Sequence, residues 1–268
     1  MANNYLRRYL GGEHEAVWAE LLALGPKVRE EPYFEPALAV CRELTRRSRL
    51  NLTTLINRLS QLDHQFWHWG ISPHLARVSA NNHDQWREEA IWELPEHIGH
   101  INDSYADTAG ALDRAEKNGI FVPLAVCTWM EDIGLVSLAG KHPTLCPFYE
   151  DREHPQIYAD PLEIQPVVDM VADSLGDTSH GFYRLRIGFD DRYKSEMGIE
   201  IHIDQDAIYW IQYPDASIDT ELKDVWFPTT FVGYLRKSFQ WGGFPGWERY
   251  PNRPEKELAF LREGLLPI

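Results

Sequence analysis

Histidines supply the first residues whose types and spacing could do chemistry. His64 and His68 are four positions apart, so on a helix both imidazoles would lie on one face, and His97 and His100 form a second close pair. A zinc site needs three or four ligands in a fixed geometry, and the chain has neither an H-E-x-x-H sequence nor a paired cysteine motif. We therefore expect ordinary surface or hydrogen-bonded histidines, and the sequence predicts no metal and no cofactor.

The three cysteines, Cys41, Cys127 and Cys146, are odd in number and far apart. This spacing argues against a disulfide framework and favours a reducing cytoplasm. Cys41 and Cys127 fall on apolar helical stripes, where a cysteine is usually a small buried hydrophobe. Because no G-x-S-x-G sequence is present and no cysteine has an adjacent histidine, we expect no nucleophilic catalysis.

A Gly-Gly pair at 242–243, within SFQWGGFPGWERYP (238–251), could belong to a phosphate-binding loop. Such a loop places its glycines after a strand and before a helix. Here the glycines follow a predicted helix, so they are expected to end that helix and turn the chain. We further expect Phe244, Pro245 and Trp247 to fold the C-terminal helix back onto the domain, with Glu248 and Arg249 exposed. The loss expected for Trp241→Ala, about 3–5 kcal/mol, requires that Trp241 be fully buried.

Charge gives the strongest clue to a partner. The formal net charge is -15, and residues 150–224 hold 18 Asp/Glu against 6 Lys/Arg, whereas residues 1–60 hold 7 against 9. An acidic region repels nucleic-acid phosphates and anionic lipids, and it would attract a basic protein. The alternative interpretation is an acidic surface that only aids solubility. The candidate binding residues are Asp190, Asp191, Glu196, Glu200, Asp204, Asp206, Asp215 and Asp219.

The elements that must position these residues follow from periodicity. Apolar residues at three- and four-residue steps predict a long helix over 35–62, with Arg42, Arg46, Arg49 and Arg58 on its solvated face. Alternating or β-branched runs predict antiparallel strands. Further helices are expected over 16–24, 107–117, 123–134, 228–239 and 253–264, and strands over 135–138, 162–164, 182–189, 198–203 and 207–213. This order predicts an α+β fold.

Four segments resemble the SUKH superfamily of proteins, which many bacteria encode beside polymorphic toxins. They are IFVPLAVCTWMEDIGLVSLAGKHP (120–143), ADPLEI (159–164), WFPTTFVGYLRKSFQWGGFPG (226–246) and RPEKELAFLREGLLPI (253–268). The resemblance implies a mixed, largely antiparallel sheet with helices packed around it over residues 94–268. Residues 1–93 would then form an N-terminal helical region packed on this domain.

The resemblance also implies a function. Many members are immunity proteins that bind a cognate toxin domain in the cytoplasm and block it without catalysis. The expected partner is a basic toxin domain, with no role for nucleic acid or membrane. Two alternatives stay open: a regulatory adaptor with a peptide ligand, and an enzyme that reverses a modification made by a toxin.

Overall fold

The computed structural model describes residues 4–66, 122–134, 136–138, 140–145, 161–164, 182–186, 208–212, 217–219, 221–222 and 229–268. The predicted helix over 107–117, the predicted strand over 198–203 and the predicted domain boundary at 93/94 lie outside these residues.

Four helical elements build the N-terminal part of the structure. They are α1 (Tyr5–Leu10), α2 (His14–Ala23), the 3-10 helix η1 (Gly25–Arg29) and α3 (Phe34–Gln61). The predicted long helix is confirmed, with bounds shifted by one residue. Its buried stripe comprises Ala37, Val40, Leu44, Ser48, Leu52, Leu55 and Leu59. Because these positions recur at three- and four-residue steps, they share the face that packs on the rest of the molecule.

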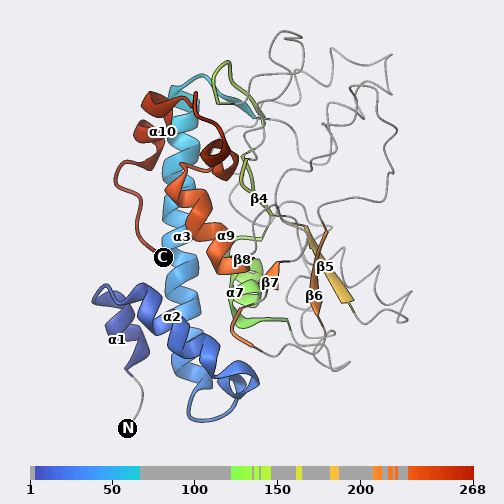
Figure 1. Cartoon of the computed structure of the whole chain (residues 1–268). Helices are drawn as coiled ribbons and strands as arrows, with labels where there is room; N and C mark the ends of the chain where they lie inside the picture. The colour runs from blue at the N-terminus through green and yellow to red at the C-terminus, as the bar shows by residue number, and fades with distance from the viewer. Residues whose placement is uncertain are drawn as a thin grey trace.

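The remaining helices come from later in the chain. They are α7 (Leu124–Asp132), α9 (Phe231–Gln240), the 3-10 helix η4 (Pro245–Arg249) and α10 (Glu255–Arg262). The side chain of Thr230 caps α9, because its hydroxyl accepts a hydrogen bond from the Gly233 amide at 3.1 Å. Figure 1 shows α3 as the long central helix, with α1 and α2 beside its N-terminal half and α10 beside its C-terminal half.

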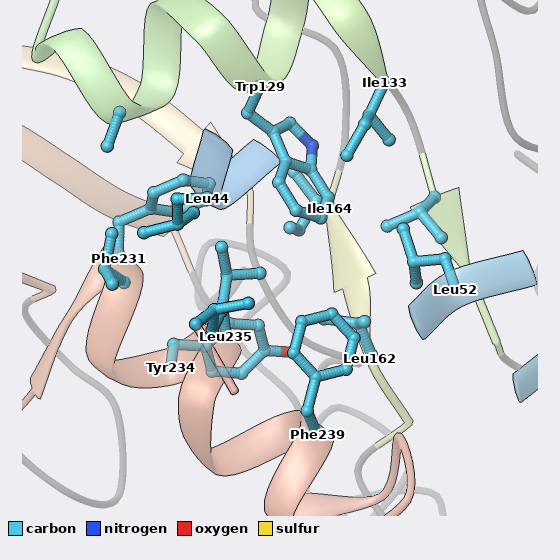
Figure 2. Packing of buried hydrophobic residues seen from close by; sticks show 14 of the residues in the cluster. Leu44, Leu52, Trp129, Ile133, Leu162, Ile164, Phe231, Tyr234, Leu235 and Phe239 are labelled. Carbon is cyan, nitrogen blue, oxygen red and sulfur yellow. The ribbon is translucent and has the colours of Figure 1, made fainter. Parts of the chain in front are cut away.

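One hydrophobic cluster joins these helices. Trp129 of α7 meets Phe231 of α9 edge-on, with ring centroids 5.7 Å apart, and Leu44 of α3 is buried in the same cluster (Figure 2). Leu162 and Ile164 of a short strand segment pack into it as well. Thr45 of α3 donates a hydroxyl hydrogen bond to Thr128 of α7 at 3.1 Å, which fixes the two helices in register.

The described strands pair only two at a time. The pairs are β1 (Gln65–Phe66) with β3 (Gly140–Lys141), β2 (Val136–Ser137) with β4 (Glu163–Ile164), β5 (Phe182–Arg186) with β6 (Ile208–Gln212), and β7 (Glu221–Leu222) with β8 (Thr229–Thr230). All four pairs are antiparallel.

The prediction of an α+β fold with a mixed, largely antiparallel sheet is therefore wrong. The described residues are mostly helical, and among them no sheet exceeds two strands. The physical reason is that the periodicity of a segment predicts a strand but does not predict which other strands pair with it. The apolar faces of α3, α7 and α9 bury one another, so helix-on-helix packing makes the core in place of a sheet.

The Gly-Gly corner is confirmed. Helix α9 ends at Gln240, and Gly242 and Gly243 follow with φ of 62° and 89°. The Gly243 carbonyl accepts a hydrogen bond from Leu162 N at 2.7 Å, so the corner also fastens β4. The buried Trp247 donates its indole N–H to the Leu145 carbonyl at 3.0 Å. Glu248, expected to be exposed, is half-buried and pairs with Lys237 at 2.7 Å.

Candidate functional site

Of the eight residues predicted to form the acidic surface, the structure describes Asp219. The other seven lie outside the described part of the chain: Asp190, Asp191, Glu196, Glu200, Asp204, Asp206 and Asp215. Six of these residues lie between β5 and β6 in the sequence, so the positions of these two strands fix the two ends of the segment that carries them. Strands β5 and β6 pair antiparallel with Arg186 opposite Ile208, so the chain leaves β5 and enters β6 at adjacent positions. All the acids from 190 to 206 therefore fall on one connection whose two ends are adjacent.

Asp219 does not belong to an exposed surface. Its side chain is 2% exposed, and its carboxylate accepts the indole N–H of Trp18 at 3.1 Å and the amide of Val232 at 3.3 Å. Val232 lies in the first turn of α9, where free N–H groups and the helix dipole favour a carboxylate. These donors hold the Asp219 carboxylate inside the molecule, so it does not lie on the surface where the predicted partner contact was expected.

The three residues 217–219 form a junction between helices. The carbonyls of Ser217 and Ile218 accept the amides of Leu124 and Ala125 at 3.3 and 2.9 Å, so the segment caps the N-terminus of α7. Through Asp219 the same segment reaches α2 and α9. Trp18 and Asp219 are 201 positions apart, so no local pattern in the sequence could have indicated this contact.

Charge is divided between the helical body and the rest of the chain. Residues 1–60 and 225–268, which carry most of the described helices, hold 15 Lys/Arg against 11 Asp/Glu, whereas residues 61–224 hold 11 against 30. Arg42, Arg46 and Arg49 are exposed on α3, as the periodicity predicted, and Arg46 pairs with Glu43 at 2.7 Å. Arg58, predicted on the same face, is half-buried and donates to the Leu261 carbonyl at 3.1 Å. The helical body is thus mildly basic beside a strongly acidic middle of the sequence.

A polar cluster joins α1, α2 and α3. Arg47 donates to Nε2 of His14 at 2.6 Å and lies over the ring of the buried Tyr9, with its guanidinium carbon 5.3 Å from the ring centroid. Burial and the neighbouring Arg47 and Arg236 lower the pKa of His14. Hydrogen bonds from Arg46 and Arg47 lower the pKa of Glu43 to about 2. This cluster therefore keeps a neutral imidazole beside cations near neutral pH.

The same cations hold the last residues of the chain against α3 and α9. Arg47 donates to the Pro267 carbonyl at 2.9 Å, and Arg236 donates to the Ile268 carbonyl at 2.8 Å. Asn51 makes two hydrogen bonds with the backbone of Leu266, at 2.9 and 2.7 Å. Main-chain groups of the protein itself therefore occupy the donors of this cluster, which gives it a structural role.

A second pair of titratable groups is buried where α3 ends. His64 and His142 are each 6% exposed, and their rings stack with centroids 6.3 Å apart. Nε2 of His64 donates to the Leu138 carbonyl at 3.1 Å. His64 is thus a hydrogen-bonded histidine, whereas His68, His97 and His100 lie outside the described residues. Within the part of the chain that the structure covers, no three His, Cys, Asp or Glu side chains are placed to hold a metal ion.

Cys41 is fully buried, and burial raises the pKa of its thiol well above the ordinary value. This confirms the expectation of a small buried hydrophobe at that position. Cys127 is half-buried, and its thiol donates to the Val122 carbonyl at 3.3 Å. Cys146 lies outside the described residues.

Comparisons with known proteins add no relative. No family model, no curated protein and no solved structure matches the chain. Among the residues that the structure describes, none of the helices has the length and apolar character needed to cross a membrane.

Proposed function

We propose that this protein is a cytoplasmic immunity protein that binds a cognate toxin domain and neutralises it by direct contact, as its resemblance to the SUKH superfamily implies. The described helical fold does not support the resemblance, so the proposal rests on charge. The observation that carries it is the excess of 18 acidic over 6 basic residues within 150–224. Such an excess attracts a basic protein surface and raises its association rate.

The acidic residues are dense between β5 and β6 in the sequence. The connection 187–207 between β5 and β6 holds 6 acidic and 2 basic residues, and the β5–β6 pairing brings its two ends together. Like charges that lie close together in the sequence produce a stronger local potential than the same charges spread along the whole chain. Asp215 and Asp219 lie beyond β6, and Asp219 is buried, so this connection is the preferred contact region.

The helical body would serve as the support for this region. Segments on both sides of it are fastened to the helices: Leu162 bonds to the Gly243 carbonyl, and Asp219 bonds to Trp18 and Val232. These contacts fix two points of the described chain, one before and one after this region in the sequence. These hydrogen bonds stabilise the fold and do not indicate which protein would bind.

Co-expression with the protein encoded by the neighbouring gene tests the proposal. The neighbour should stop growth when expressed alone, and this chain should restore growth and co-purify with it. A neighbour that is not toxic, or a toxic neighbour that this chain neither binds nor neutralises, would overturn the immunity function. Binding to a harmless neighbour would instead support a regulatory adaptor.

The role of charge is tested separately by kinetics. Asp190, Asp191, Glu200 and Asp206 are changed to Asn or Gln, and association with the neighbour is followed at low and high salt. Steering predicts a slower association rate for this variant and a smaller salt dependence, because added salt screens the same charges. The control changes four exposed glutamates of the helical body to Gln, an equal change in net charge: Glu15, Glu30, Glu31 and Glu35. Equal rates for the two variants would remove the role of the 187–207 connection.

A further inference from the structure

The buried pair His64 and His142 joins segments that are far apart in the sequence. His64 lies three residues after the end of α3, and its Nε2 reaches the carbonyl of Leu138, between β2 and β3. The pairing of β1 with β3 continues this junction, with Phe66 opposite Gly140. At Gly140 a Cβ atom would lie 2.4 Å from Nε2 of His64, so glycine is what allows the imidazole to approach the strand.

The hydrogen bonds at this junction fix where each imidazole carries its proton. Nε2 of His64 donates to a carbonyl, so in the neutral ring Nδ1 is unprotonated. That Nδ1 is buried and has no hydrogen-bond partner among the described residues. Nδ1 of His142 accepts the amides of Thr144 and Leu145 at 3.2 and 3.1 Å, so it also carries no proton.

A second proton fits neither ring. On His64 it would place a buried N–H where no described acceptor lies, at the cost of an unsatisfied charged donor. On His142 it would point at the amides of Thr144 and Leu145 and break both hydrogen bonds, and the Thr144 hydroxyl, 3.2 Å from Nδ1, could replace only one of them. Two charged rings with centroids 6.3 Å apart would also repel each other. Asp63, beside the end of α3, and Glu257 of α10 are the nearby carboxylates, and both favour a charged His142.

We propose that His64 and His142 form an acid-sensitive latch that holds the end of α3 to segment 136–145 and opens when the imidazoles are protonated. The latch also governs η4, because Trp247 donates to the carbonyl of Leu145, next to the amide that His142 binds. Phe66 and Phe244 lie edge-on to His64, so opening would expose aromatic surface.

The direction of the pH effect follows from burial. Burial lowers the pKa of His64 to about 4 and also lowers the pKa of His142. The unfolded chain, with a histidine pKa of about 6.5, binds the proton first as the pH falls. Stability from the latch is therefore complete above pH 6.5 and is lost as the pH falls toward 4. For His64 alone, the ratio of folded to unfolded protein should fall about thirtyfold between pH 7.5 and pH 5.

Two measurements on the full chain test the latch. The first is an NMR titration of the imidazole resonances, in which folded His64 should stay neutral down to about pH 5. The second is amide hydrogen exchange, corrected for intrinsic rates. The protection of the Thr144 and Leu145 amides should fall with pH well before that of the α2 amides. A pKa of His64 near 6.5, or a uniform loss of protection throughout the molecule, would overturn the proposal.

A substitution provides an independent arm. His64→Gln keeps a side-chain donor for the Leu138 carbonyl but cannot be protonated. Its urea midpoint should change much less between pH 7.5 and pH 5 than that of the parent chain. If His64→Gln does not fold, the titration and the exchange data on the unmodified protein still decide. A variant that folds and keeps the full pH dependence would show that other groups cause it.

Discussion

Two glycines of this protein occupy the same backbone conformation in different surroundings, and the difference can be measured. Gly242 has a φ of 62° and directly follows Trp241, the C-cap residue of α9. Gly264 has a φ of 65° and directly follows Glu263, the C-cap residue of α10. Both are the left-handed residue that commonly ends a helix. A Cβ at Gly242 would lie 2.7 Å from Cβ of Leu261, whereas a Cβ at Gly264 would meet nothing within 4 Å.

Substitution by alanine separates backbone strain from steric overlap. In each variant, the left-handed conformation of the alanine lowers the free energy of unfolding by about 1–2 kcal/mol. The reduced entropy of the unfolded chain returns about 0.4–1 kcal/mol in both cases. Only Gly242→Ala also overlaps with α10. The contact atom is the Cβ of Leu261, which cannot move without its backbone, so we add about 1–3 kcal/mol for overpacking.

Urea unfolding followed by far-UV circular dichroism measures the difference directly. Gly264→Ala should lose about 1 kcal/mol, and Gly242→Ala should lose about 1–3 kcal/mol more. The two variants should keep the m-value of the parent chain, so that the comparison concerns the folded state. Equal losses for the two glycines would refute the reasoning, because they would mean that α10 does not press on the corner.

Two further predictions concern tryptophans. Trp18→Phe removes the indole donor to the buried Asp219 carboxylate and should lower the free energy of unfolding by about 1.5–3 kcal/mol, measured by urea titration; an unchanged midpoint would show that this hydrogen bond contributes nothing. Trp247→Ala should lose about 3–5 kcal/mol, because that side chain is 2% exposed. Trp241→Ala should lose clearly less, because Trp241 is half-buried with Arg253 and Arg262 over its ring. The reverse order in thermal melts would contradict the burial of the corner.

The order for the tryptophans also corrects the sequence-based expectation. A loss of about 3–5 kcal/mol at Trp241 required full burial. Both tryptophans belong to the same aromatic stretch, and hydropathy alone does not distinguish them. Trp247 reaches a carbonyl of the 140–145 segment and so lies inside, whereas the two arginines cover Trp241 from the surface side.

The sequence by itself determined the long helix α3 and the Gly-Gly corner after α9. Helix α3 was predicted over 35–62 and runs from Phe34 to Gln61, and Gly242 and Gly243 end α9 as expected. These features depend on interactions between residues three or four positions apart and on the conformational freedom of glycine. Because these interactions are local, the residue types at neighbouring positions are enough to predict the helix and its end.

Only the tertiary structure decided how distant segments meet. Strand periodicity over 182–213 predicted β5 and β6, but no third strand joins them within the described residues, so the sheet was overestimated. In the sequence Asp219 is one of several acidic residues, and only the structure shows its hydrogen bond with Trp18. The sequence likewise does not indicate that His64 stacks on His142. A strand's neighbour, a carboxylate's donors and an imidazole's burial are all set by residues far away in the chain, and contacts over such separations leave no period in the sequence.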